Sequence, residues 1–481
     1  MMGFQSEPQG KLFFTNINME KRVRSNHPLR KIAFTIDFDF AYEAVKDKYG
    51  NNGNESVPPP VLLKLMLLLV FYNVRSEREL MDTLPERLDW LWFLGYDLET
   101  EIPNHSVLSK ARKRWGVEVF KGFFERIVWQ CVQAGLVDGR KIFMDSSLVE
   151  ADASLNSVVD TQSLKGQLAL KYLELEKRLE DGSAERYVRP NSRPVNRRYL
   201  STTDPDAALV RRVSGISKPR YQVHRAVDGR SEVITATEVT SGEINEAHLL
   251  EPLVDQHHDN TNQNAQTVVA DGKYGTIENF LACSERGLEA HMPDLGDAER
   301  QRASKRPIFP ASQFQYDPGS DTYQCPAGQQ LKRKTVHWDR HNIDYAAPKS
   351  VCAVCDLREK CTANKSGRSL KRHFRQEELD RMRGKSRSWI SEQDIRIRQH
   401  LMERSFARAQ RYGFARMRWR RLWRVKIQEY LTAVIQNIGV LVRYGRGPKA
   451  AGTVLRGFWR NSSNLIKGFL RISNPLFAGC R

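Results

Sequence analysis

Three acidic residues are the strongest candidates for chemistry in this chain. Asp145 follows a short apolar run in KIFMDSS, Asp271 follows the apolar run QTVVA, and Glu403 lies in a basic stretch with helical periodicity. Carboxylates are the hard oxygen ligands that Mg²⁺ prefers, and two such ions can stabilise the attacking and leaving oxygens of a phosphoryl transfer. The three acids are therefore candidate ligands of a metal site that cleaves phosphodiesters.

Each acid also has an ordinary structural interpretation. An aspartate at the end of a strand is commonly a turn or cap residue, and Gly272 after Asp271 fits a turn. A glutamate on a basic helix usually makes an exposed ion pair worth less than about 1 kcal/mol. The arginines that could pair with Glu403 are Arg398, Arg404, Arg408 and Arg411. The position of the aspartates favours the metal interpretation. The carboxyl ends of adjacent strands form a crevice that commonly binds ligands, and two carboxylates in it would repel each other unless a cation lay between them.

Four of the seven cysteines form a second candidate metal site. Cys325 lies in a CPAG turn, Cys352 and Cys355 form a CxxC pair, and Cys361 follows six residues later. Four thiolates in two groups are typical of a tetrahedral structural zinc site, which leaves no open position for chemistry. The alternative is a set of reduced core cysteines. Either interpretation fits a reducing, intracellular location.

The charge of the chain indicates a polyanionic partner. Its 481 residues carry a formal net charge of +19, which favours nucleic acid, although charge alone does not exclude a membrane surface or a ribosome. The N-terminus lacks the pattern of a secretory signal. The longest apolar run, residues 57–74, contains three prolines and Lys64, so we expect a buried core helix and no membrane span.

Two basic segments could contact DNA. Residues 103–115 predict a helix with four basic residues, which either lies against DNA or forms a solvated face. Residues 411–426 alternate arginines with aromatic residues, which either bind phosphates and stack on bases or pack the chain onto the sheet. The candidate DNA-binding residues are Lys110, Arg112, Lys113, Arg114, Arg408, Arg411, Arg416 and Arg418.

The periodicity predicts an α/β protein with several parts. Apolar residues at helical spacing indicate an all-α domain over residues 1–135, and alternating strands and helices predict a mixed sheet with flanking helices from residue 136 to 293. A polar segment, residues 153–220, separates its first two strands. We expect a cysteine-rich, zinc-ribbon-like insertion over 294–390, C-terminal helices completing the core over 391–445, and a basic tail of unassigned role over 446–481.

A series of segments in fixed order resembles the DDE transposases of bacterial insertion sequences. They include VRSERELMDTL, MDSSLVEADAS, YQVHRAVD, VVADGKYGTIENF, YQCPAGQQL, VCAVCDLREKC and ERSFARAQRYGFARMRWR. The resemblance is to the branch with a helical N-terminal domain and a cysteine-bearing insertion. It extends from about residue 25 to residue 443, which is most of the chain.

The resemblance implies an RNase H-like core in which Asp145, Asp271 and Glu403 take the DDE positions. It implies cleavage dependent on Mg²⁺ (or Mn²⁺) at the terminal inverted repeats, followed by strand transfer into target DNA. The partners would be double-stranded DNA and further copies of the chain, in the cytoplasm and nucleoid of a bacterial host, with no membrane and no small-molecule substrate. The sequence departs from the family at three positions: Lys273 replaces a glycine, Gln410 replaces a lysine, and Arg398 is one residue from the usual arginine.

Two other functions compete with this interpretation. The first is a DNA-binding protein without catalysis, either a decayed or a domesticated transposase, and the presence of all three acids argues against it. The second is a host nuclease on the same fold, which would cleave without preference for terminal repeats and would not join strands.

Overall fold

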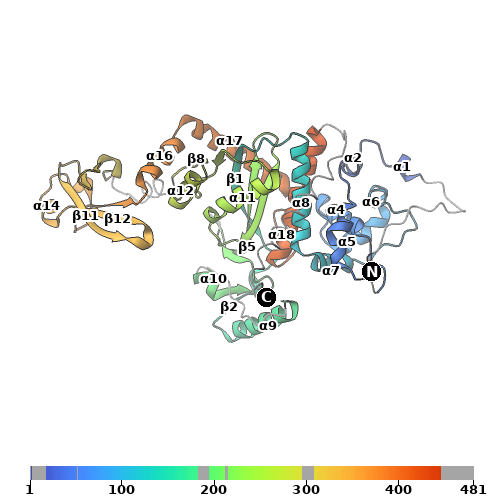
Figure 1. The fold of residues 1–481 in the computed structure, drawn as a ribbon. Coiled ribbons are helices and arrows are strands. Elements are labelled where there is room, and N and C mark those ends of the chain that lie inside the picture. The colour runs from blue at the N-terminus through green and yellow to red at the C-terminus, as the bar shows by residue number, and fades with distance from the viewer. Residues whose placement is uncertain are drawn as a thin grey trace, which may run out of the picture.

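The computed structural model describes Met2 and residues 18–50, 53–181, 194–211, 215–294 and 308–445. Figure 1 shows an elongated molecule in which a central sheet lies between a bundle of N-terminal helices and a small, separate β unit. A further small unit, which carries α9 and α10, projects from one end of the central sheet.

The N-terminal region is helical, as the sequence predicts. Its α-helices are α1 (Met19–Arg22), α2 (Pro28–Thr35), α3 (Phe40–Val45), α4 (Pro59–Phe71), α5 (Glu77–Thr83), α6 (Leu88–Leu94), α7 (Ser106–Trp115) and α8 (Val117–Gln133). Helix α4 begins at a pair of prolines and is buried along almost its whole length, so the apolar run is a core helix. No helix within the described parts of the chain is both long and apolar enough to cross a bilayer.

The central sheet is mixed. Its strands are β1 (Lys141–Glu150), β4 (Ala208–Val210), β5 (Lys218–Asp228), β6 (Ile234–Ser241), β7 (Thr267–Val269) and β8 (Glu289–His291). Strand β5 pairs antiparallel with β1, β4 and β6, whereas β7 pairs parallel with β1 and β8 pairs parallel with β7. The spatial order β6-β5-β1-β7-β8 therefore places β1 at the centre, between the antiparallel and parallel halves.

Helices cover both faces of this sheet because its strand residues alternate in direction. Ile142 and Met144 pack with α11 (Leu250–Thr261), α12 (Ile277–Glu285) and α16 (Gln376–Ser386). Phe143 packs on the opposite side, with α17 (Trp389–Gln410) and α18 (Leu422–Tyr444). Helix α18 also packs against α8, and so it joins the N-terminal bundle to the sheet. The predicted mixed α/β architecture is confirmed.

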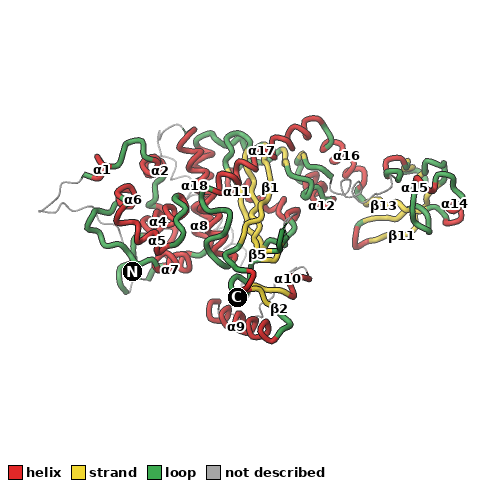
Figure 2. Tube along the Cα trace, turned by 180° about the vertical axis from the view of Figure 1, so that it is seen from behind, coloured by secondary structure: helices red, strands yellow, loops and turns green. Residues whose placement is uncertain are grey.

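Two smaller sheets lie outside this core. Strands β2 (Val158–Asp160) and β3 (Tyr199–Ser201) pair beside α9 (Leu164–Asp181) and α10 (Pro194–Arg198). The second sheet has five antiparallel strands, β9 (Gln315–Asp317), β10 (Thr322–Gln324), β11 (Gln330–His337), β12 (Asn342–Ala346) and β13 (Ser369–His373), next to the short helices α14 (Lys349–Ala353) and α15 (Arg358–Cys361). Figure 2 shows the five-stranded unit at the end of the molecule opposite the N-terminal helices.

A buried ion pair fixes α18 to the central sheet. The Arg225 guanidinium on β5 donates to both carboxylate oxygens of Glu429 on α18, at 2.7 and 3.0 Å, and both side chains are almost fully buried. Arg225 also donates to the Ser405 carbonyl on α17. One strand residue therefore positions both helices on this face of the sheet.

Replacing Glu429 with glutamine should lower the free energy of unfolding by about 3–5 kcal/mol, because it leaves the Arg225 charge buried without a carboxylate. Chemical denaturation measures this loss. Glu43→Gln is the control, since it breaks an exposed pair with Lys46 and should cost less than about 1 kcal/mol. Similar losses in the two variants would contradict the role of the buried pair.

Candidate metal centre

The pairing of β1 with β7 places the two aspartates side by side. The last pair of this parallel ladder is Phe143 opposite Val269. Asp145 and Asp271 each follow two residues later, at the same level of the sheet. The expectation that β1 ends at Asp145 is wrong, because β1 continues to Glu150 through its pairing with β5. Asp145 therefore lies in mid-strand, and the end of the shorter β7 makes room for both carboxylates.

A third carboxylate joins them from an unexpected position. Glu246 opens a short 3₁₀ turn after β6, and its side chain is buried. Oxygens of Asp145, Glu246 and Asp271 all lie within 4.8 Å of one another, and this is the single such group of possible metal ligands within the described residues. No clear sequence signal marks Glu246, since Asn245 before it is a helix cap and a glutamate in a first helical turn is ordinary.

Two cationic side chains lie against this acidic cluster. Arg398 on α17 donates to Asp145 Oδ2 at 2.7 Å, and the Lys273 ammonium lies 2.6 Å from Glu246 Oε1. The Ser146 hydroxyl donates to the second oxygen of Glu246 and accepts from the Gln222 amide at 2.7 Å. Glu246 is thus held in place by neighbours on β1 and by the loop that follows β7.

The cluster is electrostatically strained. Burial raises the pKa of Asp145 to about 6, although the positive charge of Arg398 acts in the opposite direction, and the neighbouring acids raise it further. Burial alone would lower the pKa of Lys273, but its bond to Glu246 and the nearby carboxylates raise it. Both shifts show that the site has an excess of negative charge. A bound cation would offset that charge.

Tyr274 adds an unsatisfied polar group to the site. Its side chain is fully buried, and its hydroxyl is without a hydrogen-bond partner in the parts of the chain that the structure describes. Burial raises the pKa of Tyr274 well above its usual value, and the charges of Glu246, Asp145 and Asp271 raise it further. A buried hydroxyl this close to three acids is poised to bond a ligand or a water held there.

Glu403 does not join the acidic cluster in this structure. It is exposed on α17, and Gln399 donates to its carboxylate at 3.2 Å. Arg398 takes the position that faces Asp145, and Glu403 is five residues later, roughly 140° around the helix. Of the three acids expected to converge, Asp145 and Asp271 lie close together with Glu246 beside them, and Glu403 lies apart from this group.

The candidate DNA-binding residues fall into two groups. Lys110, Lys113 and Arg114 on α7 are exposed, as is Arg411. The others have partners within the protein. Arg408 pairs with Glu232 and Arg416 with Asp152, while Arg418 donates to Asn73.

Arg112 does not contact DNA as the sequence suggests. Its side chain is buried, pairs with Glu77 and lies 4.0 Å from the centre of the Trp419 ring. It therefore cannot reach DNA in this arrangement and instead joins α7 to the segment before α18. Two of the aromatic residues in the segment 411–426, Phe414 and Trp419, are also buried, which favours the interpretation that they pack the chain onto the sheet.

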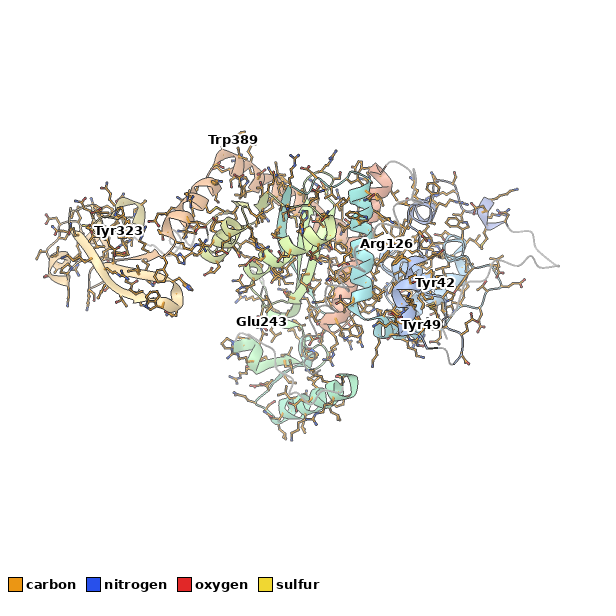
Figure 3. All side chains as sticks on the ribbon, viewed as in Figure 1. Tyr42, Tyr49, Arg126, Glu243, Tyr323 and Trp389 are labelled. Atoms are coloured by element: carbon orange, nitrogen blue, oxygen red, sulfur yellow. The ribbon has the colours of Figure 1, made fainter. Side chains whose placement is uncertain are left out.

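The four clustered cysteines line one region of the five-stranded unit, but no three of their sulfur atoms lie within 4.8 Å of one another. Cys325, Cys352, Cys355 and Cys361 line one cavity beside β11, α14 and α15. The Gln329 amide donates to Cys325 Sγ at 3.3 Å. Burial raises the pKa of Cys361, and the three other thiols raise it further while Arg368 lowers it. Tyr323 marks this unit in Figure 3.

Two family models match the chain. A transposase domain (DUF772) matches residues 17–114, which cover most of the N-terminal helices, and a transposase DDE domain matches residues 324–442. Glu403 lies inside the second match, while Asp145, Glu246 and Asp271 lie between the two. No curated protein and no solved structure matches the chain.

In metal-free buffer, Asp145→Asn should gain stability over the unsubstituted protein as the pH rises from about 4 to 7. The raised pKa means that the folded protein keeps a proton on Asp145 up to about pH 6, whereas the unfolded chain loses it near 3.8. The folded state thus binds more protons in this window, and its stability falls with pH. Asparagine removes that penalty, worth roughly 1–3 kcal/mol.

Urea denaturation at the two ends of this pH range, with a chelator present, measures the difference. Asp339→Asn, at an exposed aspartate, is the control and should show no such trend. An Asp145→Asn advantage that is equal at both pH values would contradict the burial of an ionisable carboxyl.

Proposed function

Because the chain belongs to the DDE transposases of insertion sequences, we propose that it binds the terminal inverted repeats of such an element and catalyses metal-dependent strand cleavage and strand transfer. The observation that supports this most is the juxtaposition of Asp145, on β1, and Asp271, just after the parallel neighbouring strand β7. The DNA would be that of a bacterial cell, with the protein acting at the nucleoid.

The sheet supports an RNase H-like core. Three antiparallel strands, β1, β5 and β6, are followed by two strands parallel to β1, with helices on both faces. The acids lie where the parallel half meets the antiparallel half, at the central strand. In an open α/β sheet this switch point is the usual place for a ligand.

The residues of the acidic cluster suit a divalent metal. Three carboxylates supply hard oxygen donors close together, and the Tyr274 hydroxyl is a buried polar group in need of a partner. Asp145, Asp271 and Glu246 would hold the ion, which when bound activates the attacking oxygen and stabilises charge on the phosphate. Manganese, which accepts the same ligands, would substitute for magnesium.

The cationic side chains at the site have a role of their own. Arg398 and Lys273 now neutralise Asp145 and Glu246. A DNA phosphate entering between them would find a guanidinium and an ammonium already placed, and the bidentate geometry of arginine suits phosphate oxygens. Each of the two side chains would then leave its carboxylate and bind a phosphate of the strand to be cut.

Glu403 remains our proposed third member of the DDE set. It lies within the matched transposase DDE domain and on the helix that packs over β1. To approach Asp145, α17 would have to rearrange locally around Arg398. Glu246 and Glu403 thus have separable roles, the first in holding the ion in the arrangement described and the second in strand cleavage.

Asp145→Asn, Asp271→Asn and Glu403→Gln should each abolish cleavage of DNA that carries the element's ends, while gel-shift binding of the same DNA stays nearly unchanged. Glu246→Gln should instead raise the Mn²⁺ concentration needed for half-maximal cleavage by about tenfold or more, because one ligand is lost. Glu377→Gln, at an exposed glutamate, is the matched control.

Normal cutting by Asp145→Asn or Asp271→Asn would contradict the proposed site. If Glu403→Gln cuts normally and Glu246→Gln does not cut at all, Glu246 is the third catalytic acid. A DNA-binding protein without catalysis is the second candidate function, favoured by the bond between Arg398 and Asp145 and by the position of Glu403. Binding of the ends with no metal-dependent nicking by the unsubstituted protein would establish it.

We also propose that the four cysteines hold a structural zinc ion. They are the donor type that zinc prefers, and they line one cavity in a unit whose apolar core is small. Such a unit gains much of its folding free energy from its metal. With four thiolates bound, the ion would hold α14 and α15 against β11 and take no part in cleavage.

Cys352→Ser should release zinc and unfold only the five-stranded unit, because the remaining three thiolates bind the ion more weakly. Metal content and limited proteolysis measure both effects. Cys283→Ala, at a buried cysteine of the central core, should keep its zinc. A purified protein that is free of zinc yet resists proteolysis throughout this unit would overturn the proposal.

A further inference from the structure

Helix α9 carries an apolar stripe that nothing in the described structure covers. Leu164, Leu168, Tyr172 and Leu175 are 79, 61, 68 and 53% exposed. They follow one another at intervals of four, four and three residues, so they lie on one side of the helix. The opposite side packs inward, where Leu173 is buried. A contiguous exposed stripe of this kind is a mark of an interaction surface.

The helix is fixed to the core, so the stripe has a defined direction. Gly166 lets α9 approach β2 closely, since a β-carbon there would lie 1.9 Å from the Asp160 carbonyl oxygen. Glu176 pairs with Arg421, the residue before α18. In the same unit, Asn196 on α10 donates to Glu243 after β6 at 2.8 Å. Figures 1 and 3 show α9 at the outer edge of this unit, with Glu243 between it and the sheet.

The spacing along the stripe is that of a coiled-coil seam. Leu168 and Leu175 are one heptad apart and take d positions, and Tyr172 takes the a position between them. Lys171 and Glu176 border the seam on opposite sides, at g and e positions. Lys171 is exposed, and Glu176 is partly so beside Arg421.

The charges on either side of the apolar stripe are complementary to those of a second copy of α9. In a parallel pair of helices, the g residue of one lies beside the e residue of the next heptad in the other. For two copies of α9, this places Lys171 of each beside Glu176 of the other, so both contacts join opposite charges. Glu176 can accept from both cations, because a carboxylate has two oxygens.

We propose that α9 forms a parallel, two-fold symmetric contact with α9 of a second copy of this chain. Two-fold contacts use the same patch on both partners, and this seam is complementary to itself. The seam is too short for an independent coiled coil, so it supplies an interface between folded protomers. Such a contact would keep two acidic clusters in one particle before DNA is bound. It does not depend on whether those acids cleave DNA.

Light scattering after gel filtration of the full chain, without DNA or metal, tests the contact. The unsubstituted protein should be a dimer at micromolar concentration. Leu168→Ser combined with Leu175→Ser should weaken dimerisation by about a hundredfold, and Lys171→Glu or Glu176→Lys each by about tenfold. Lys177→Glu makes the same charge change outside the seam and should leave the dimer intact.

Mixing the two charge variants distinguishes a contact from a folding defect. A Lys171→Glu chain and a Glu176→Lys chain repel copies of themselves but attract each other, so native mass spectrometry of the mixture should show a one-to-one heterodimer. Circular dichroism confirms that each variant is folded. A monomeric unsubstituted protein, a dimer that survives the paired leucine substitutions, or a mixture that stays monomeric would overturn the proposal.

Discussion

The central constraint in this structure is the crowding of three carboxylates at one level of a sheet. Asp145, Asp271 and Glu246 approach one another closely in a partly buried place, and burial together with the two neighbouring acids raises the pKa of Asp145. Such an arrangement persists only if cations offset the charge or if surrounding structure holds it. Here Arg398 and Lys273 supply the cations. We infer that the divalent ion of a DDE enzyme would take over part of that role.

The surrounding structure explains why the acids cannot move apart. Asp145 lies on β1 and Asp271 directly follows β7, which pairs with β1, while Glu246 is bonded to Ser146 on the same central strand. On the face of the sheet that α17 and α18 cover, Arg225 joins β5 to both helices through buried contacts. The helix that carries Arg398 and Glu403 is therefore seated by a residue one strand away from Asp145. A loss of that seating would disturb the acidic cluster from a distance.

Much of the fold was predictable because its signals are local. Buried apolar runs identify α4, α18 and β7, and both aspartates stand out because each directly follows a short apolar run in the sequence. The full length of β1 was not predictable, since it depends on pairing with β5. Glu246 is not recognisable from the sequence because a first-turn glutamate is common, and its place beside the aspartates arises from the path of the chain after β6. Arg112 was assigned to DNA by its basic neighbours, whereas tertiary contact with Glu77 and Trp419 buries it.

The most direct test of the central claim is a crystal structure of the protein soaked in Mn²⁺ and measured for anomalous scattering. We expect a peak between Asp145 and Asp271, at roughly 2.1–2.3 Å from carboxylate oxygens, with Arg398 displaced from Asp145. The same map would show whether Glu246 or Glu403 completes the ligand set. Absence of any peak at millimolar Mn²⁺, with the bond between Arg398 and Asp145 intact, would contradict a metal centre at these acids.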